Sequence, residues 1–202
     1  MTFGANTSVE IMVGIAMVAY APSIRYLQDL VKAQHVIWDI HEHWIKQTIR
    51  NRCEIAASDG KLSLVIPIKH VQNKQALGAI EVDDKQPWRR NHWRTLKTCY
   101  QNAPYFQDYA FELEGIFESK TRHLVAFNHS ILQIFQEAWD LPLRLDWSME
   151  FNPYTKDDLR LEDWFERKEH MTRYYQVFQI QKPFIPNLSC FDLLFNEGSK
   201  IT

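Results

Sequence analysis

Two histidines separated by one residue, His41 and His43, begin a stretch dense in polar side chains. Because an imidazole changes charge near neutral pH, either one could act as a general base. Two imidazoles at this spacing on a strand could also bind a metal ion. A third ligand would then come from His70, His92 or His170. No spacing singles out one of these, so we predict acid/base chemistry and no metal site.

Basic side chains follow the two histidines and recur along the chain. They are Lys46, Arg50, Arg52, Arg89, Arg90 and Arg94. A guanidinium makes paired hydrogen bonds with anionic oxygens, so this set could bind phosphate. By residue type alone, a solvated face paired with Asp and Glu explains the same residues. Aromatic residues lie among the later arginines, as stacking platforms for nucleic acid would, but a net charge of -2 argues against such a partner.

Alternation of side chains predicts that residues 41–68 fold as a β-hairpin. Asp59-Gly60 is expected to form its turn, because both central positions of a type I′ turn need positive φ. On the first strand Cys53 then lies on the core face, while Arg50 and Arg52 share the opposite face. Cys53 is therefore expected to be inert packing instead of a nucleophile.

The pattern before the hairpin predicts a βαβ unit. A continuously apolar run at 9–19 indicates a buried strand, a helix begins near Pro22, and a second short strand covers 35–40. In open α/β sheets, ligands bind where such strands end. Another strand is expected at 77–82.

The second half of the chain is predicted to be mainly helical. Helices are expected at about 87–101, 105–118, 121–139 and 189–198, the last with Ser189 and Asp192 in a capping relation. Residues 159–169 are expected to form an exposed helix or an ordered lobe, and residues 174–178 a strand. The fold class is therefore α/β: an N-terminal mixed sheet with a βαβ-like start and a β-hairpin, followed by a mainly helical half packed against it. We expect one domain, 1–202, with lobes of about 8–84 and 85–202.

Composition excludes several classes of protein. Hydrophobic residues make up 46% and aromatic residues 13%, which excludes intrinsic disorder. Three cysteines without a CxxC pair indicate neither a disulfide framework nor a zinc ribbon, so a cytoplasmic location is expected. The apolar run 11–21 is too short for a membrane span and lacks a basic flank. A glycine-rich phosphate loop, a GxSxG elbow and an HExxH motif are absent from the sequence.

Motifs spread over nearly the whole chain form a specific combination. They are Tyr20-x-Pro22 with Tyr26, HEHWIKQTIRNRCEI at 41–55, GKLSLVIPI at 60–68, HWRTLKTCYQNAPYFQDY at 92–109, Phe127-Asn128, YYQVF at 174–178 and PNLSCFDLLFNEG at 186–198. With these motifs the chain resembles the WbqC-like family of bacterial proteins, whose genes often accompany surface-polysaccharide and O-antigen synthesis. It departs from the family at Ala21-Pro22, where two prolines usually follow the aromatic residue.

The resemblance implies a cytoplasmic protein that works near nucleotide-activated sugars, and it names neither a reaction nor a cofactor. We predict an enzyme that transfers an acyl or aminoacyl group to a nucleotide-activated amino sugar. The alternative is a non-catalytic binding or scaffold protein of a glycan-assembly complex. The expected partner is a small molecule, a nucleotide-sugar or an acyl donor, and the sequence predicts no oligomeric state.

Under this hypothesis each candidate residue has a role. His41 or His43 accepts the proton of the attacking amine. The arginines Arg50, Arg52 and Arg94 hold a diphosphate or carboxylate. Tyr20, Trp93 and Tyr105 stack on a base or sugar. The hairpin arm, the helix start near residue 92 and the terminal segment are expected to share one pocket, to which the other contacts are Lys46, Gln47, Asn51, His92, Asn187, Ser189, Asp192 and Asn196.

Overall fold

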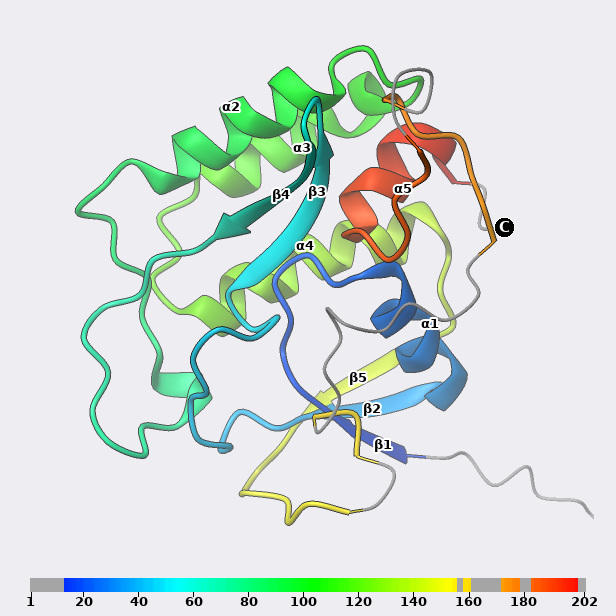
Figure 1. Cartoon of the computed structure of the whole chain (residues 1–202). Coiled ribbons are helices and arrows are strands. Elements are labelled where there is room, and N and C mark those ends of the chain that lie inside the picture. The colour runs from blue at the N-terminus through cyan, green and yellow to red at the C-terminus, as the bar shows by residue number, and fades with distance from the viewer. Residues whose placement is uncertain (1–12, 156–157, 161–171, 179–182, 200–202) are drawn as a thin grey trace, which may run out of the picture.

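The chain begins with the predicted βαβ unit. The computed structural model describes residues 13–155, 158–160, 172–178 and 183–199. Strand β1 (Val13–Ala16) pairs in parallel with β2 (His35–Trp38), and helix α1 (Ile24–Ala33) connects them (Figure 1). The helix begins after Ser23, whose hydroxyl oxygen accepts a hydrogen bond from the N–H of Tyr26. The part of the first strand expected at 9–12 lies outside the described residues.

A third strand comes from the middle of the helical half. Strand β5 (Arg144–Trp147) pairs in parallel with β2, so the sheet has the order β1-β2-β5. Local sequence cannot specify this partner, because the pairing joins residues more than a hundred positions apart. The helical half is thereby fixed to the N-terminal strands.

The predicted hairpin is present but forms a sheet of its own. Strands β3 (Arg52–Ala57) and β4 (Gly60–Val65) pair in antiparallel register, separate from the parallel sheet. The turn lies one residue earlier than expected, at residues 58–59, because Ala57 pairs with Gly60. Of the two residues expected to have positive φ, only Gly60 does, at 120°. The expected type I′ turn is therefore wrong.

Two other predicted strands are also wrong. Residues 77–82 begin with a short 3-10 helix, η1 (Leu77–Ala79), because the N–H groups of Leu77 and Gly78 bond to carbonyls at residues 42 and 40. Residues 174–178 make no strand, since their side chains bind the last helix instead. The helix expected at 159–169 lies mostly outside the described residues.

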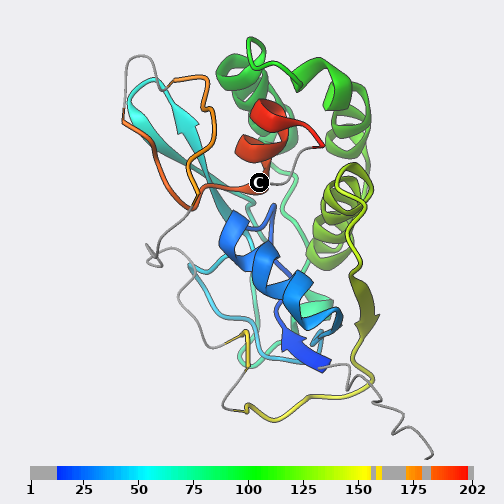
Figure 2. The same ribbon diagram turned by 90° about the vertical axis from the view of Figure 1, so that its right-hand side faces the viewer.

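Four further α-helices complete the fold. They are α2 (Trp88–Tyr100), α3 (Phe106–Glu118), α4 (Leu124–Ala138) and α5 (Cys190–Glu197). Helix α5 contacts α1, α3, α4 and β3, and the two views place it beside the hairpin (Figures 1 and 2). Its buried aromatic rings, such as Phe195, pack against Phe106 and Tyr100. The predicted packing of a helical half against the α/β part is confirmed.

Candidate functional site

The two candidate catalytic histidines lie on the segment between β2 and the hairpin. His41 and His43 are exposed, and the ring of His43 stacks on Phe151 with 6.5 Å between ring centroids. Lys46 and Gln47, further along this segment, are also exposed. Among the described residues, no three His, Cys, Asp or Glu side chains are grouped so as to hold a metal ion. Of the possible third ligands, His170 lies outside the described residues.

Arg50 lies inside the protein, because the strand begins only at Arg52 and the expected alternation does not extend back to it. Its side chain is 1% exposed and binds the carboxylate of Glu42 through Nε at 2.8 Å and Nη2 at 2.6 Å. The neighbouring Nη1 donates to the hydroxyl of Thr48. Burial raises the pKa of Glu42, and the guanidinium opposes that rise. Arg50 is thus a partner of Glu42 within the core.

Tyr20 and His92, two further candidates, form a buried pair. The phenol oxygen of Tyr20 and Nδ1 of His92 are 3.0 Å apart, and burial lowers the pKa of His92 to about 4. Asn51, at the base of the hairpin, donates to the carbonyl of Ile66 at 2.8 Å. These polar groups have protein partners in the interior.

Asp192 is the centre of a buried hydrogen-bond network. Its carboxylate accepts bonds from the phenols of Tyr100 at 2.7 Å and Tyr174 at 2.6 Å, and from the amide of Gln176 at 3.0 Å. The Tyr100 oxygen also accepts from the backbone N–H of Ala56 in β3. Burial raises the pKa of Asp192 to about 6. The network joins the hairpin, the last residue of α2 and the terminal segment, whereas the sequence predicts that the start of this helix, near residue 92, meets the other two parts.

The other terminal candidates also have backbone partners. Ser189 Oγ accepts from Phe191 N and donates to a carbonyl at residue 21, so it caps α5 without the side chain of Asp192. Asn187 Oδ1 accepts from a backbone N–H of α1, and Asn196 donates to the carbonyl of residue 192 at 2.7 Å. The N–H of Tyr105 donates to a carbonyl of α5 at 3.0 Å. These contacts position α5.

The carboxyl end of β2, where ligands are expected in this kind of sheet, is filled by the protein itself. Asp39 Oδ1 accepts bonds from the N–H groups of residues 41 and 42 and from Ser148 Oγ, and Oδ2 accepts from the N–H of Asn152. The buried Arg160 binds Asp39 and Asp158. Asp39 therefore organises the loops at this edge.

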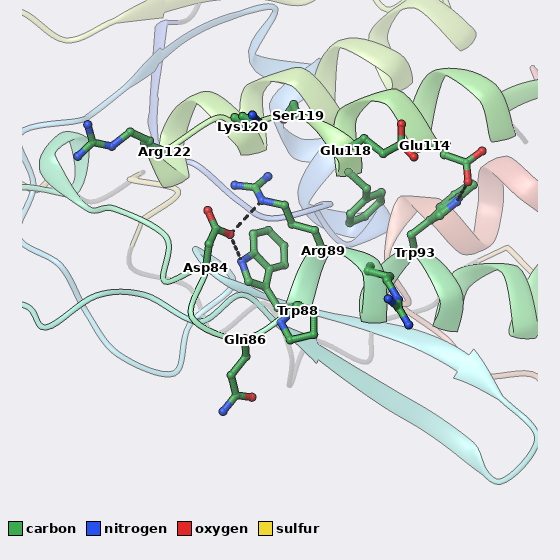
Figure 3. A pocket seen from close by; sticks show the side chains of 13 residues that line it. Asp84, Gln86, Trp88, Arg89, Trp93, Glu114, Glu118, Ser119, Lys120 and Arg122 are labelled. Carbon is green, nitrogen blue, oxygen red and sulfur yellow. Dashed lines mark hydrogen bonds and ion pairs between the residues drawn. The ribbon is translucent and has the colours of Figure 1, made fainter.

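A pocket of about 770 Å³ lies where the start of α2 meets the end of α3 (Figure 3). Pockets that bind small molecules have volumes of about 300–1,000 Å³. Trp88, Trp93 and Phe117 contribute apolar walls. The charged residues of the lining are the cations Arg89, Arg90, Lys120 and Arg122 and the carboxylates Asp84, Glu114 and Glu118.

The N-terminus of α2 forms one wall of this pocket and carries the wrong charge for a helix start. Pro87 precedes the helix and supplies no side-chain cap, and the first turn holds no acidic residue. Arg89 and Arg90 occupy that turn instead. The first N–H groups of a helix favour anions and disfavour cations. An anion in the pocket would therefore lie near the positive end of the helix and near the charges of Arg89 and Arg90.

Arg89 is held rigidly in this wall. Its Nε donates to Asp84 at 3.1 Å, its Nη2 donates to the carbonyl of Thr121 at 2.5 Å, and its guanidinium carbon lies 4.5 Å from the Trp88 ring centroid. Its Nη1 is buried and has no hydrogen-bond partner within the described part of the chain. Unlike Arg89, the side chains of Arg90 and Lys120 make no ion pair with the described residues, so their charges are available to a ligand.

Sequence reasoning identified part of this pocket. Arg89, Arg90 and Trp93 stood among the basic and aromatic candidates, but the loop residues 119–122 did not. The available signal was Pro87 followed within three residues by two arginines, an unusual start for a helix. Arg94, the next arginine of α2, lines a different pocket of about 420 Å³ beside the hairpin turn.

The described residues contain no helix with the length and apolarity needed to cross a membrane. Neither the curated proteins nor the solved structures that were searched include a match to this chain. A family model, that of the WbqC-like protein family, matches residues 18–176, which is most of the chain and includes β2, the hairpin and helices α2 to α4. The resemblance inferred from the sequence motifs is thereby confirmed, and the chain belongs to the WbqC-like protein family.

Proposed function

We propose that this protein is an enzyme of bacterial surface-polysaccharide synthesis that binds a nucleotide-activated amino sugar and transfers an acyl or aminoacyl group to it. Membership of the WbqC-like family fits a polysaccharide-related function. The observation that carries the proposal is the pocket between the start of α2 and the end of α3, which combines cationic groups with apolar walls. A nucleotide-activated sugar presents the matching chemistry, a diphosphate between two ring systems.

The diphosphate is placed at the start of α2. There the helix N-terminus carries a partial positive charge, and the side chains of Arg89 and Arg90 carry full positive charges. Lys120 approaches from the loop after α3. Bonds between a guanidinium and a phosphate are charge-assisted and often paired, so they supply both affinity and orientation.

The sugar or base is placed against the apolar wall. Trp93 is 6% exposed and stacks on Phe117, with 5.9 Å between ring centroids. Its indole N–H donates to Glu114 at 2.6 Å, which fixes the ring. Such a preformed apolar surface binds a ring without having to be ordered first.

The candidate catalytic residues predicted from the sequence, His41 and His43, do not line this pocket. The pocket supports the binding of the nucleotide-sugar. That His41 or His43 accepts the proton of the amine is a separate part of the proposal, which the pocket does not support. Its test is the turnover of the variants His41→Gln and His43→Gln. Both side chains are exposed, so neither variant should lose folding stability.

Calorimetric titration of the purified protein with uridine diphosphate and its sugars tests the binding step. We expect the double variant Arg90→Ala/Lys120→Ala to lose affinity by at least about tenfold, since each lost charge-assisted bond is worth about 1.5–3 kcal/mol. The control is Arg94→Ala, because Arg94 is an exposed arginine of the same helix outside this pocket. Equal loss in the control, or no binding of any nucleotide by the wild type, would contradict the proposal.

A non-catalytic scaffold remains the second candidate, and one surface observation favours it. Phe111 of α3 is 87% exposed and Met149, after β5, is 92% exposed. A partner protein could use such exposed apolar side chains as anchors. A scaffold would lose its partner in a Phe111→Ser variant and show no turnover, whereas the enzyme would keep its turnover in that variant.

A further inference from the structure

The end of α3 carries the opposite charge from the start of α2, in the same pocket. Helix α3 ends at Glu118, and no basic residue occupies its last turn. The carbonyl end of a helix favours cations, so Glu118 is as unfavourable there as Arg89 and Arg90 are at the start of α2. Figure 3 shows the carboxylate and the Arg89 guanidinium coming from these two different helices.

We infer that the pocket selects a ligand that carries a primary amine as well as a phosphate, and that Glu118 binds the amine. The inference rests on the proposed function, because the phosphate of the same ligand must bind at the start of α2. A ligand of this kind would place its positive group at the negative helix end and its negative group at the positive helix end. It would thus relieve both unfavourable helix termini at once.

Glu118 differs from the other two carboxylates of the pocket in having no partner among the residues that the structure describes. Asp84 accepts bonds from Trp88 Nε1 at 2.8 Å and from Arg89 Nε at 3.1 Å. Glu114 accepts bonds from an indole N–H at 2.6 Å and from a lysine ammonium at 3.2 Å. Within the described ranges, Glu118 forms neither a hydrogen bond nor an ion pair, although cations line the same pocket.

Glu118 is an exposed side chain of the pocket lining, so a ligand can reach its carboxylate. Arg90 and Lys120 are flexible cations in the same lining, and neither lies within ion-pair distance of the carboxylate. Positive and negative groups that stay apart in one pocket leave both available to a ligand. A primary ammonium suits the carboxylate, since it offers three donors and a compact charge.

The recognition of an amine has a direct test in the choice of ligand. We would titrate the wild-type protein with UDP-glucosamine, UDP-N-acetylglucosamine and UDP-glucose, which share the nucleotide and differ in the amine. UDP-glucosamine should bind about tenfold more tightly than the other two, because only it brings a cation to the carboxylate. The variant Glu118→Gln should remove this preference and keep the affinity for UDP-glucose.

A matched control is available on the same helix. Glu112 is also an exposed glutamate of α3 but does not line the pocket, so Glu112→Gln should keep the preference. Equal affinities of the wild type for all three sugars, or an unchanged preference in Glu118→Gln, would overturn the inference while leaving the diphosphate site in place. Binding of none of the three sugars would overturn the proposed function and the inference with it.

Discussion

The charge of Arg90 is expected to cost folding stability and to supply ligand affinity. This arginine is exposed, lies in the first turn of α2, and forms no ion pair with the described residues. A cation at this end of a helix is unfavourable by about 0.3–1 kcal/mol. Replacing it by glutamate removes that cost and adds a favourable interaction of similar size. The variant Arg90→Glu should therefore unfold with a free energy about 1 kcal/mol higher than the wild type.

The expected change is large enough to measure. For a chain of 202 residues, about 1 kcal/mol corresponds to a rise of about 2–4 °C in Tm. The rise should shrink in 1 M salt, where the screening length falls to about 3 Å. Affinity for uridine diphosphate should fall by more than about tenfold in the same variant, because a cation is exchanged for an anion beside the phosphate.

Calorimetric unfolding without ligand, and a separate titration with uridine diphosphate, measure the two effects on one protein preparation. The control is Arg94→Glu, one turn further along α2, where the effect of the helix terminus has largely faded. A lower Tm in Arg90→Glu would refute the claim that its charge is unfavourable in the free protein. Unchanged affinity would refute its role in binding.

Four further predictions concern the buried polar groups and the end of α5. The pKa of Asp192 is raised to about 6, so between about pH 4 and 6 the folded chain holds a proton that the unfolded chain has released, and the free energy of unfolding falls as pH rises through this range. The fall is on the order of 3 kcal/mol, and Asp192→Asn should remove it, as measured by urea unfolding at both ends of the range. The pKa of His92 is lowered to about 4, so between about pH 4 and 6.5 the unfolded chain binds the extra proton, and the free energy of unfolding rises with pH. His92→Gln should remove this rise, which is of similar size, in the same urea measurements. Glu42→Ala leaves the buried Arg50 unpaired and should lower the free energy of unfolding by about 3–5 kcal/mol, whereas a loss below about 1 kcal/mol would show that the pair is solvated. Gly198→Ala places a Cβ 2.6 Å from an aromatic ring at a φ of +63°, so it should lower Tm in a thermal scan, and an unchanged Tm would show that the ring moves freely.

Periodicity in the sequence predicted the elements that depend on local pattern. The βαβ start and the helices α2, α3 and α4 follow from apolar spacing and from breaks at prolines. Strand β5 could not be predicted with its partner, because a four-residue strand gains its stability from the parallel pairing with β2 and not from its own residues. Residues 174–178 read as a strand because they are rich in aromatic residues, yet Tyr174 and Gln176 bind Asp192 through their side chains.

The site was harder to predict than the fold. Extending the strand period back to residue 50 predicts an open face for Arg50. The strand begins only two residues later, at Arg52, and the structure buries Arg50 against Glu42. Conversely, the pocket combines Arg89 and Arg90 with Glu118, which come from two helices whose ends meet only because α2 and α3 pack side by side. Sequence spacing does not predict that the start of α2 and the end of α3 meet, although the unfavourable charges at these two helix ends are visible in the sequence.

The indole N–H signals in a nitrogen–proton correlation spectrum test the central claim most directly. Trp88 and Trp93 line the pocket, and their indole N–H groups donate to Asp84 and Glu114 in its wall. The chain has seven tryptophans. On titration with UDP-glucosamine, the indole signals of Trp88 and Trp93 should shift with ligand concentration. Trp38, in β2 outside this pocket, supplies the reference signal. Shifts of other indole signals while those of Trp88 and Trp93 stay fixed, or no shift at millimolar ligand, would contradict a nucleotide-sugar site in the pocket between α2 and α3.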